Sequence, residues 1–360
     1  MKNIILSKRS LLPELASRAS KWHWNYYLHG RGRPLLAGMY ITNECNLACR
    51  NCNIWRDTKK QTISRHQYNS LVSSLGEMGG FYFSISGGEP LLVSDICDRL
   101  AYAKKHIPYV HLVSNGWLLD AEKAVELSDS GVDEVSISID GLEAFHDAQR
   151  GRIGSYKRAF DAVKNMKRFA PNVVVSVNSI ITPENANDIY HLINSTGRLG
   201  VFHKVQPLNL HPIFSNQSSE SVGVSASEEQ IRNVVDLVDF MKDQDHVVNS
   251  AKFLDSIVPH FRGECSGGVF EEDCLLPEFF CEFRQDGAVS PCLAASGWKV
   301  AFPTAGKELN TVFGSIEYAA YKKSLRECRE CKKNAYVCYL EPRLIFPLPV
   351  LLKNKMEAPK

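Results

Sequence analysis

The sequence has no long hydrophobic run and almost no net charge. Its longest apolar stretch, residues 344–352, is far shorter than the run of about 20 residues that a membrane-spanning helix needs, and it contains Pro347 and Pro349. Lys and Arg total 42 against 40 Asp and Glu, which leaves a formal charge of +2. So small a net charge gives no overall field for binding a nucleic acid. We therefore expect neither a transmembrane protein nor a nucleic-acid partner.

A secretory signal peptide is also missing from the sequence, although the chain has 11 cysteines. Thiols in a chain without such a signal point to a reducing, cytoplasmic compartment, where cysteines bind metal more often than they form disulfides. The 360 residues are enough for a large core and, as a first expectation, about two domains. The cysteines are therefore the first place to look for function.

Residues 1–36 are basic and aromatic. Seven Lys and Arg residues face a single acid, Glu14, for a net charge of +6, and four aromatic residues between positions 22 and 27 are interleaved with them. Cations and aromatic rings suit an interfacial helix on anionic lipid. The pattern also fits a helix that caps the main domain with its charges in water. The same two interpretations apply to residues 343–360, an apolar segment that ends in lysines.

From residue 37 to about residue 245, short apolar stretches alternate with segments of helical periodicity. Several stretches are unbroken apolar or β-branched runs, as in parallel strands that are buried on both faces. The predicted strands are residues 38–42, 81–86, 110–114, 135–139, 173–180 and 202–206. Helical spacing lies between them, for example in Tyr68, Leu71, Val72 and Leu75. Six such units predict an α/β fold, a partial (β/α)6 barrel that binds ligands at the carboxyl ends of its strands.

Three cysteines, Cys45, Cys49 and Cys52, follow the first predicted strand at x3 and x2 spacing. Three thiolates on one loop can bind three irons of a 4Fe–4S cube, whereas most cubes have four cysteine ligands. The fourth iron is then open to a small chelating molecule. A zinc site is the main alternative, but zinc-binding cysteines usually come in pairs with nearby histidines, and none flank this loop.

This loop resembles that of the radical S-adenosylmethionine (radical SAM) superfamily. In that family the open iron chelates the amino and carboxylate groups of S-adenosylmethionine (SAM). One electron then cleaves the sulfonium and yields a 5′-deoxyadenosyl radical that abstracts hydrogen from a substrate. The resemblance implies a SAM-binding 4Fe–4S cluster on Cys45, Cys49 and Cys52, with a low-potential electron donor as a partner. One departure is Asn51, where relatives usually carry an apolar or aromatic residue near adenine.

Further motifs of the same family follow in order near the ends of predicted strands: Gly-Gly-Glu-Pro, a turn similar to Thr-Asn-Gly, a polar strand end and an arginine. The residues that the resemblance assigns to SAM are Gly87, Gly88, Glu89, Pro90, Ser114, Asn115, Ser138, Asp140 and Arg150. The glycines permit close approach of the backbone to a ligand, and the Glu89 carboxylate suits an ammonium. The Arg150 guanidinium can bind the carboxylate of SAM bidentately. Taken alone, each could be a loop residue whose polar groups are hydrogen-bonded by neighbouring residues. However, the four motifs occur in the same order as in the family, which argues against chance.

Seven of the remaining eight cysteines fall between residues 265 and 338. A hairpin that turns at Gly287 is predicted between Cys274 and Cys292, and Cys328 and Cys331 follow as C-x2-C. The region resembles the SPASM and twitch extensions of radical SAM enzymes, which implies an auxiliary 4Fe–4S cluster. We expect these four cysteines as its ligands, because the hairpin and the C-x2-C each bring two thiolates together.

Other assignments of this region stay open. Cys281 is the main competitor among the ligands, Cys338 could also serve, and Cys265 is least suited because Ser-Gly-Gly follows it. A full SPASM module continues with two more cysteines, but here Cys338 comes one residue late and Pro342 stands at the last position. This break favours one auxiliary cluster over two. A structural zinc ribbon is the alternative.

The sequence as a whole predicts four parts: a basic aromatic helical segment over residues 1–36, the barrel over 37–245, a small cysteine-rich hairpin and helix domain over 260–342, and an apolar and basic tail over 343–360. The resemblance implies an enzyme that matures a peptide or oxidises a small molecule or lipid-linked group. The expected location is the cytoplasm, with peripheral binding at a membrane as the second expectation from the basic segments. The alternative is a non-catalytic iron–sulfur electron carrier. The Gly-Gly-Glu-Pro motif and Arg150 favour the enzyme, because a carrier needs no SAM cradle.

Overall fold

The centre of the computed structural model is a curved eight-stranded sheet with the order β6-β5-β4-β3-β2-β1-β7-β8. Residues 8–30, 32–209, 226–264, 274–332 and 335–347 are described. The strands are β1 Leu36–Thr42, β2 Tyr82–Gly87, β3 Tyr109–Ser114, β4 Glu134–Ser138, β5 Val174–Ile181, β6 Phe202–Pro207, β7 Phe280–Phe283 and β8 Val289–Ser290. Strands β1 to β7 are parallel, and β8 is antiparallel to β7. The predicted α/β class and its six barrel strands are confirmed.

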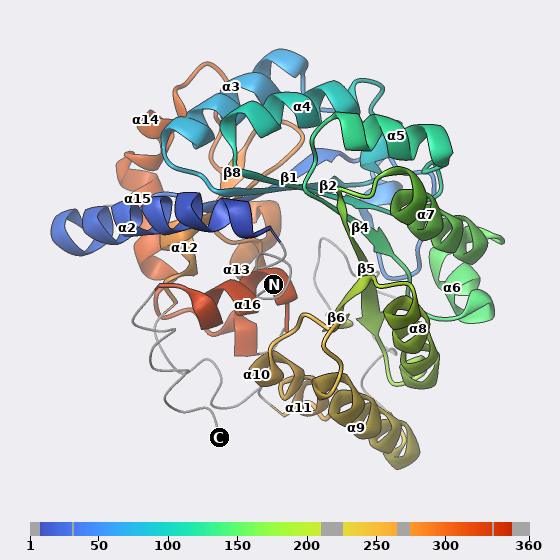
Figure 1. Cartoon of the computed structure of the whole chain (residues 1–360). Helices are drawn as coiled ribbons and strands as arrows, with labels where there is room; N and C mark the ends of the chain where they lie inside the picture. Colours follow the sequence, from blue (N-terminus) through green and yellow to red (C-terminus); the bar gives the residue numbers. More distant parts are fainter. Residues whose placement is uncertain (1–7, 31, 210–225, 265–273, 333–334, 348–360) are drawn as a thin grey trace.

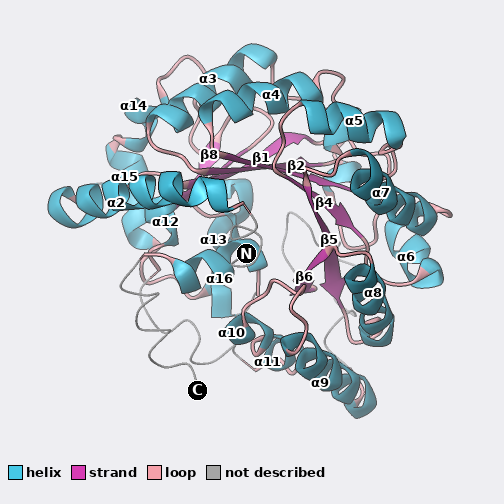
Figure 2. Ribbon diagram, viewed as in Figure 1, coloured by secondary structure: helices cyan, strands magenta, loops and turns pink. Residues whose placement is uncertain are grey.

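Helices cover the outer face of this sheet (Figures 1 and 2). They are α3 Arg65–Glu77, α4 Ile96–His106, α5 Ala121–Asp129, α6 Glu143–Arg150, α7 Ser155–Phe169, α8 Ala186–Arg198 and α9 Glu228–Lys242. In α3 the four residues at helical spacing, Tyr68, Leu71, Val72 and Leu75, are all buried. The Ser64 side chain caps α3 by accepting a backbone N–H of the first turn, which would otherwise lack a partner. Apolar periodicity and capping thus fix the layer that surrounds the strands.

After α9 come α10 Ala251–Leu254 and α11 Ile257–Phe261, which pack against α9, and α11 also contacts β6. The chain then reaches the other edge of the sheet, beside β1. The helices of this last part are α12 Leu276–Phe279, α13 Leu293–Ser296, α14 Leu309–Phe313, α15 Ile316–Ser324 and α16 Val337–Ile345. Strand β7 pairs in parallel with β1, so the β7–β8 hairpin extends the sheet of the barrel. Its turn contains Gly287 with φ +80°, a left-handed conformation that favours glycine. The cysteine-rich region therefore begins on the barrel itself.

Helix α2 (Leu12–His29) packs one side against the body of the protein. Trp22 is buried, and its indole N–H donates to the carbonyls of Arg33 (3.0 Å) and Glu278 (3.2 Å). The same ring contacts Phe279 and Phe346. The helix thus caps the main domain, and its other side faces away from it. No helix in the described ranges is long and apolar enough to cross a membrane.

Polar side chains fill the inside of the barrel below the strand ends. Strand residues alternate between the two faces of a sheet, and His111 on β3 reaches Ser84 on β2 (2.9 Å) and Ser136 on β4 (2.6 Å). Lys204 on β6 forms an ion pair with the buried Glu134 on β4. Burial alone would raise the pKa of Glu134, but Lys204 and His111 hold it well below its usual range. Aliphatic side chains dominate most barrel interiors. The interior of this barrel instead holds a buried ion pair and hydrogen-bonded polar side chains.

We expect Lys204→Met to lower the free energy of unfolding by about 3–5 kcal/mol, because loss of one partner leaves a buried charge uncompensated. Urea unfolding at neutral pH measures the change, and the double variant with Glu134→Gln should recover much of it. Because the pKa of Glu134 is lower in the folded state, its ion pair stabilises the fold at pH values above the pKa of the unfolded state. This stabilisation is lost as the pH falls toward the pKa of the folded state. The difference in unfolding free energy between the wild type and Lys204→Met should therefore become smaller in acid. Equal stability at neutral pH would contradict this account.

Candidate functional site

A cavity of about 270 Å³ lies at the carboxyl ends of the strands. Each of the six barrel strands contributes a side chain near its end: Tyr40, Ser86, Val113, Ser138, Ile180 and Gln206. The loop after β1 adds the three cysteines, and α16 with the residue before it adds Tyr336, Cys338 and Tyr339. Segments almost 300 residues apart in the sequence therefore meet in one space.

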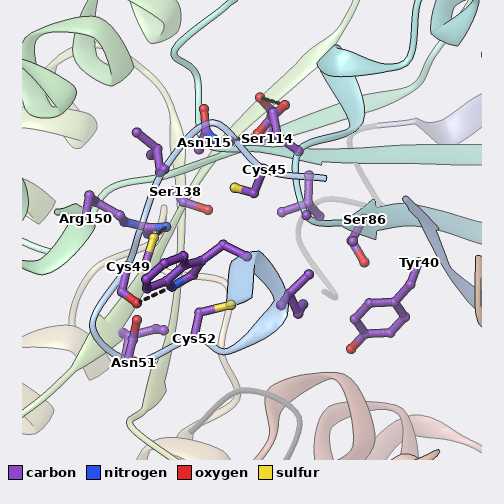
Figure 3. Close-up of a pocket in the computed structure, with 18 of the residues that line it drawn as sticks. Tyr40, Cys45, Cys49, Asn51, Cys52, Ser86, Ser114, Asn115, Ser138 and Arg150 are labelled. Atoms are coloured by element: carbon purple, nitrogen blue, oxygen red, sulfur yellow. Dashed lines mark hydrogen bonds between the residues drawn. The ribbon is translucent and has the colours of Figure 1, made fainter. Parts of the chain in front are cut away.

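Cys45, Cys49 and Cys52 all line this cavity (Figure 3). The Cys52 N–H donates to the Cys49 carbonyl at 3.3 Å, and the Trp55 indole N–H donates to the same carbonyl at 3.1 Å, which fixes the turn of the loop. Burial raises the pKa of Cys45 to about 11 and that of Cys52 to about 12. Metal binding requires thiolates, and the charge of the metal offsets the cost of burying them. Three converging thiols at a cavity fit three irons of a 4Fe–4S cube.

The carboxylate of Glu89 is buried at the same cavity. Its Oε1 accepts hydrogen bonds from Ser114 Oγ (2.7 Å) and the Leu91 N–H (3.1 Å), and its Oε2 accepts one from the Asn115 N–H (2.7 Å). Burial raises the pKa of Glu89, although these hydrogen bonds and the nearby Arg150 oppose the shift. The carboxylate is held rigidly and faces a space where a cation can enter. It therefore fits the ammonium group of SAM.

The two glycines before Glu89 allow the strand end to pack against the cysteine loop. The Gly88 N–H donates to the Thr42 carbonyl at 2.8 Å, and the Glu89 N–H donates to the Glu44 carbonyl at 2.7 Å. A Cβ on Gly88 would lie only 1.9 Å from the Glu44 carbonyl oxygen, and one on Gly87 would lie 2.4 Å from that of Thr42. Gly87 also has φ +134°. Both glycines thus allow close packing against the backbone after β1, and both also line the cavity.

Arg150 lies between the cysteine loop and β4 (Figure 3). Its guanidinium forms an ion pair with Asp140 at 2.7 Å and lies 3.9 Å from Cys49 Sγ. Burial alone would lower the pKa of Arg150, but Asp140 and Cys49 raise it, so the charge is retained. Asp140 is itself buried and also accepts the Ile180 N–H at 3.0 Å. Its contacts make it a support for Arg150.

Seven of the nine residues that the resemblance assigned to SAM line the cavity: Gly87, Gly88, Glu89, Ser114, Asn115, Ser138 and Arg150. Pro90 and Asp140 are outside the lining. Asn51, the departure from the family pattern, is part of it.

Helix α16 contributes cavity residues that the sequence did not place there. Cys338 is exposed although protein surrounds it, because its side chain opens into the cavity. The Tyr339 hydroxyl donates to the carboxylate of Glu282 on β7, and burial raises the pKa of Glu282 to about 7. Of these residues, only Cys338 had a signal in the sequence, as a member of the second cysteine group. Tyr336 and Tyr339 had none.

The four expected auxiliary ligands lie near one another. Cys274, Cys292 and Cys331 are buried, and Cys328 is half-buried. Burial raises the pKa of Cys331 to about 12, and Cys274 and Cys328 are close enough to raise it as well. Burial also raises the pKa of Cys292, with further contributions from Cys331 and Cys274. The hairpin and the C-x2-C thus lie close to each other in the fold.

Cys281 is set apart from these four. It is fully buried on β7, and its pKa is raised by burial and by Glu282 but by none of the other cysteines. Cys265 lies outside the described residues. Over the described ranges, no three His, Cys, Asp or Glu side chains form a site for a single metal ion. A cube binds each thiolate at a different iron, so its ligands stand farther apart than those of one ion.

The barrel thus brings three thiols and a buried carboxylate together at its strand ends. Residues 39–195 of this chain match the model of the Radical SAM superfamily.

Relatives match this chain at moderate identity. The AdoMet-dependent heme synthase of Oleidesulfovibrio alaskensis is 29% identical over 163 residues, which cover 44% of this chain and 42% of the relative. The mycofactocin maturase MftC of Mycolicibacterium smegmatis is 30% identical over 183 residues, 50% of this chain and 46% of the relative. The chain thus spans about half the length of the curated relatives it matches.

The solved structure of Streptococcus suis SuiB bound to S-adenosylmethionine has a TM-score of 0.66 to this chain at 16% identity, covering 88% of this chain and 76% of SuiB. SuiB has also been solved with its precursor peptide SuiA. At this identity the likeness shows the fold, which extends beyond residues 39–195 into the cysteine-rich region.

Proposed function

We propose that the protein is a radical SAM enzyme that holds a 4Fe–4S cluster on Cys45, Cys49 and Cys52 and binds SAM beside it. The observation that carries the proposal is the meeting of these three thiols and the buried Glu89 carboxylate in one cavity. When bound, the cluster and SAM supply hydrogen abstraction from a substrate, driven by one electron from a low-potential donor. A non-catalytic electron carrier has no need of a cavity with a rigid carboxylate.

In this proposal the residues of the chain divide the cavity into two parts. Glu89 receives the ammonium of SAM, and Ser114 and Asn115 keep its carboxylate in position through their hydrogen bonds. Arg150 is held by Asp140 beside the thiolate of Cys49 and also lines the cavity. The side formed by α16 is left for the substrate.

We further propose an auxiliary 4Fe–4S cluster on Cys274, Cys292, Cys328 and Cys331. The influence of these cysteines on one another's pKa values supports this set, whereas none of the four affects the pKa of Cys281. Because Tyr336 lies within the electrostatic influence of Cys331 and Cys292 and also lines the cavity, α16 connects the two sites. An auxiliary cluster there is placed to bind the substrate or to accept its electron.

Among substrates, a peptide is favoured over a small molecule. One relative is named a maturase, and the similar fold of SuiB binds a precursor peptide. A small-molecule oxidation is the second candidate, because another relative is a heme synthase. Mass spectrometry of the molecules retained on anaerobically purified protein separates the two. A retained peptide supports maturation, and a retained tetrapyrrole or other small molecule would overturn it.

Glu89→Ala should weaken SAM binding by about 1.5–3 kcal/mol, the usual contribution of a hydrogen bond to a charged group. Calorimetric titration of the anaerobic, cluster-loaded protein with SAM measures this loss of affinity directly. Glu44→Ala is a matched control, because Glu44 lies on the cysteine loop but outside the lining of the cavity. Unchanged SAM affinity in Glu89→Ala would remove Glu89 from the site.

A further inference from the structure

The carboxyl-terminal end of α2 exposes an apolar patch made of Trp24, Tyr27 and Leu28. Their exposed fractions are 64%, 52% and 60%. The i, i+3 and i+4 spacing places them on one face of the helix. Trp22, on the inner side, is buried against the body of the protein. Figure 1 shows α2 beside α12 and α15, with one end extending past them. The patch therefore belongs to a helix that is anchored but not covered by the described residues.

The segment that carries this patch is basic. Residues 1–36 have a net charge of +6, and their only acid, Glu14, is in an ion pair with Arg18 at 2.6 Å. Lys21 is exposed one turn before Trp24. The nearest acid on the neighbouring α12 is Glu278, which is buried and paired with Lys322 and Arg326. The exposed acids Glu317 and Glu327 lie on and after the neighbouring α15, where the exposed Lys323 and Arg329 offset them. The excess of positive charge therefore comes from the α2 segment.

We propose that this patch binds the protein to an anionic lipid membrane. Trp and Tyr combine an apolar ring with a polar group and are favoured at headgroup depth, where Leu28 adds apolar area. Lys21, exposed one turn before Trp24, would face the lipid phosphates, which gives an attraction that salt screens. Aromatic, aliphatic and basic side chains on one helix in the plane of a surface match this occupant better than a neutral protein face.

The position of α2 also determines which face of the enzyme meets the membrane. Lys8 donates to the carbonyl of Asn172, just before β5, and Arg18 donates to that of Gly80, just before β2. The helix therefore lies at the amino-terminal ends of the strands, whereas the cavity is at their carboxyl ends. Membrane binding through the patch leaves the cavity facing the aqueous side. The inference therefore stands independently of the proposed catalytic activity.

Co-sedimentation of the full chain with vesicles tests the proposal. Vesicles of phosphatidylcholine with about one third phosphatidylglycerol should bind the wild type, and phosphatidylcholine alone should bind it poorly. Replacing Trp24, Tyr27 and Leu28 by serine should reduce binding at least about tenfold. The matched control replaces three exposed apolar residues elsewhere, Leu118, Ile153 and Tyr190, by serine and should bind like the wild type. Circular dichroism and iron content check that all variants fold.

Three outcomes would overturn the proposal. They are failure of the wild type to bind, equal binding by the patch variant and the wild type, and binding that is indifferent to phosphatidylglycerol and salt. Sedimentation velocity without lipid tests for a competing occupant. If the wild type is a dimer, the patch variant is a monomer and neither binds vesicles, the patch belongs to an interface with a second copy of the chain.

Discussion

Replacing Cys45, Cys49 and Cys52 together by alanine should remove one four-iron cluster per chain and abolish the release of 5′-deoxyadenosine from SAM. All three thiols line one cavity with Glu89, and the barrel holds no other group of cysteines that could replace them in the described ranges. Iron analysis and chromatography of the nucleoside products measure the two losses. Both should be complete, because the cluster supplies the electron that cleavage needs.

The matched control for this experiment is Cys97→Ala. Cys97 lies on α4, contacts Glu126 at 3.7 Å and is far from the lining of the cavity. Its loss should change neither iron content nor SAM cleavage. Release of 5′-deoxyadenosine by the triple variant at the wild-type rate would end the radical SAM interpretation of this cavity.

The second large effect concerns the auxiliary site. The triple variant should retain about four irons per chain as one cluster, because a closed cube has four thiolate ligands. Adding Cys292→Ala and Cys331→Ala should remove this iron, since both thiols are buried beside Cys274. Adding Cys281→Ala instead should not, because none of the four expected ligands affects the pKa of Cys281. Mössbauer and EPR spectra distinguish the outcomes.

Other results would revise the ligand set. Two clusters in the triple variant would indicate a full SPASM module, in which Cys338 or residues outside the described ranges take part. Zinc in place of iron would indicate a structural ribbon. Loss of iron with Cys281→Ala would move that residue into the site and exclude one of the four cysteines proposed here.

The strands and the motif residues at their ends could be predicted from the sequence because both depend on local patterns. Apolar runs mark buried parallel strands, and all parallel strands bring their carboxyl ends to one edge, so Cys45, Glu89 and Ser138 had to meet. Seven of the nine residues expected around SAM do line the cavity. The packing of the two glycines against the backbone after β1 could not be predicted, since the contact of Gly88 with the Glu44 carbonyl joins two loops that the sequence does not connect.

The remainder of the cavity depends on tertiary contacts that leave no local signal. Tyr336 and Tyr339 reach it only because β7 pairs with β1 and brings α16 back over the barrel. A cysteine-rich hairpin that joins the main sheet cannot be told from a separate unit by its spacing. The ion pair of Asp140 with Arg150 is similar, because its two residues come from a strand end and a helix end that the sequence does not connect.

The most direct test of the central claim is the product of the wild-type chain with SAM. Reconstituted anaerobically with iron and sulfide and reduced by a low-potential donor, the protein should convert SAM to 5′-deoxyadenosine and methionine in equal amounts, and only when the reductant is present. Chromatography with mass detection quantifies both products. If the protein carries its full iron and binds SAM but yields no 5′-deoxyadenosine, the claim that this cavity cleaves SAM is contradicted.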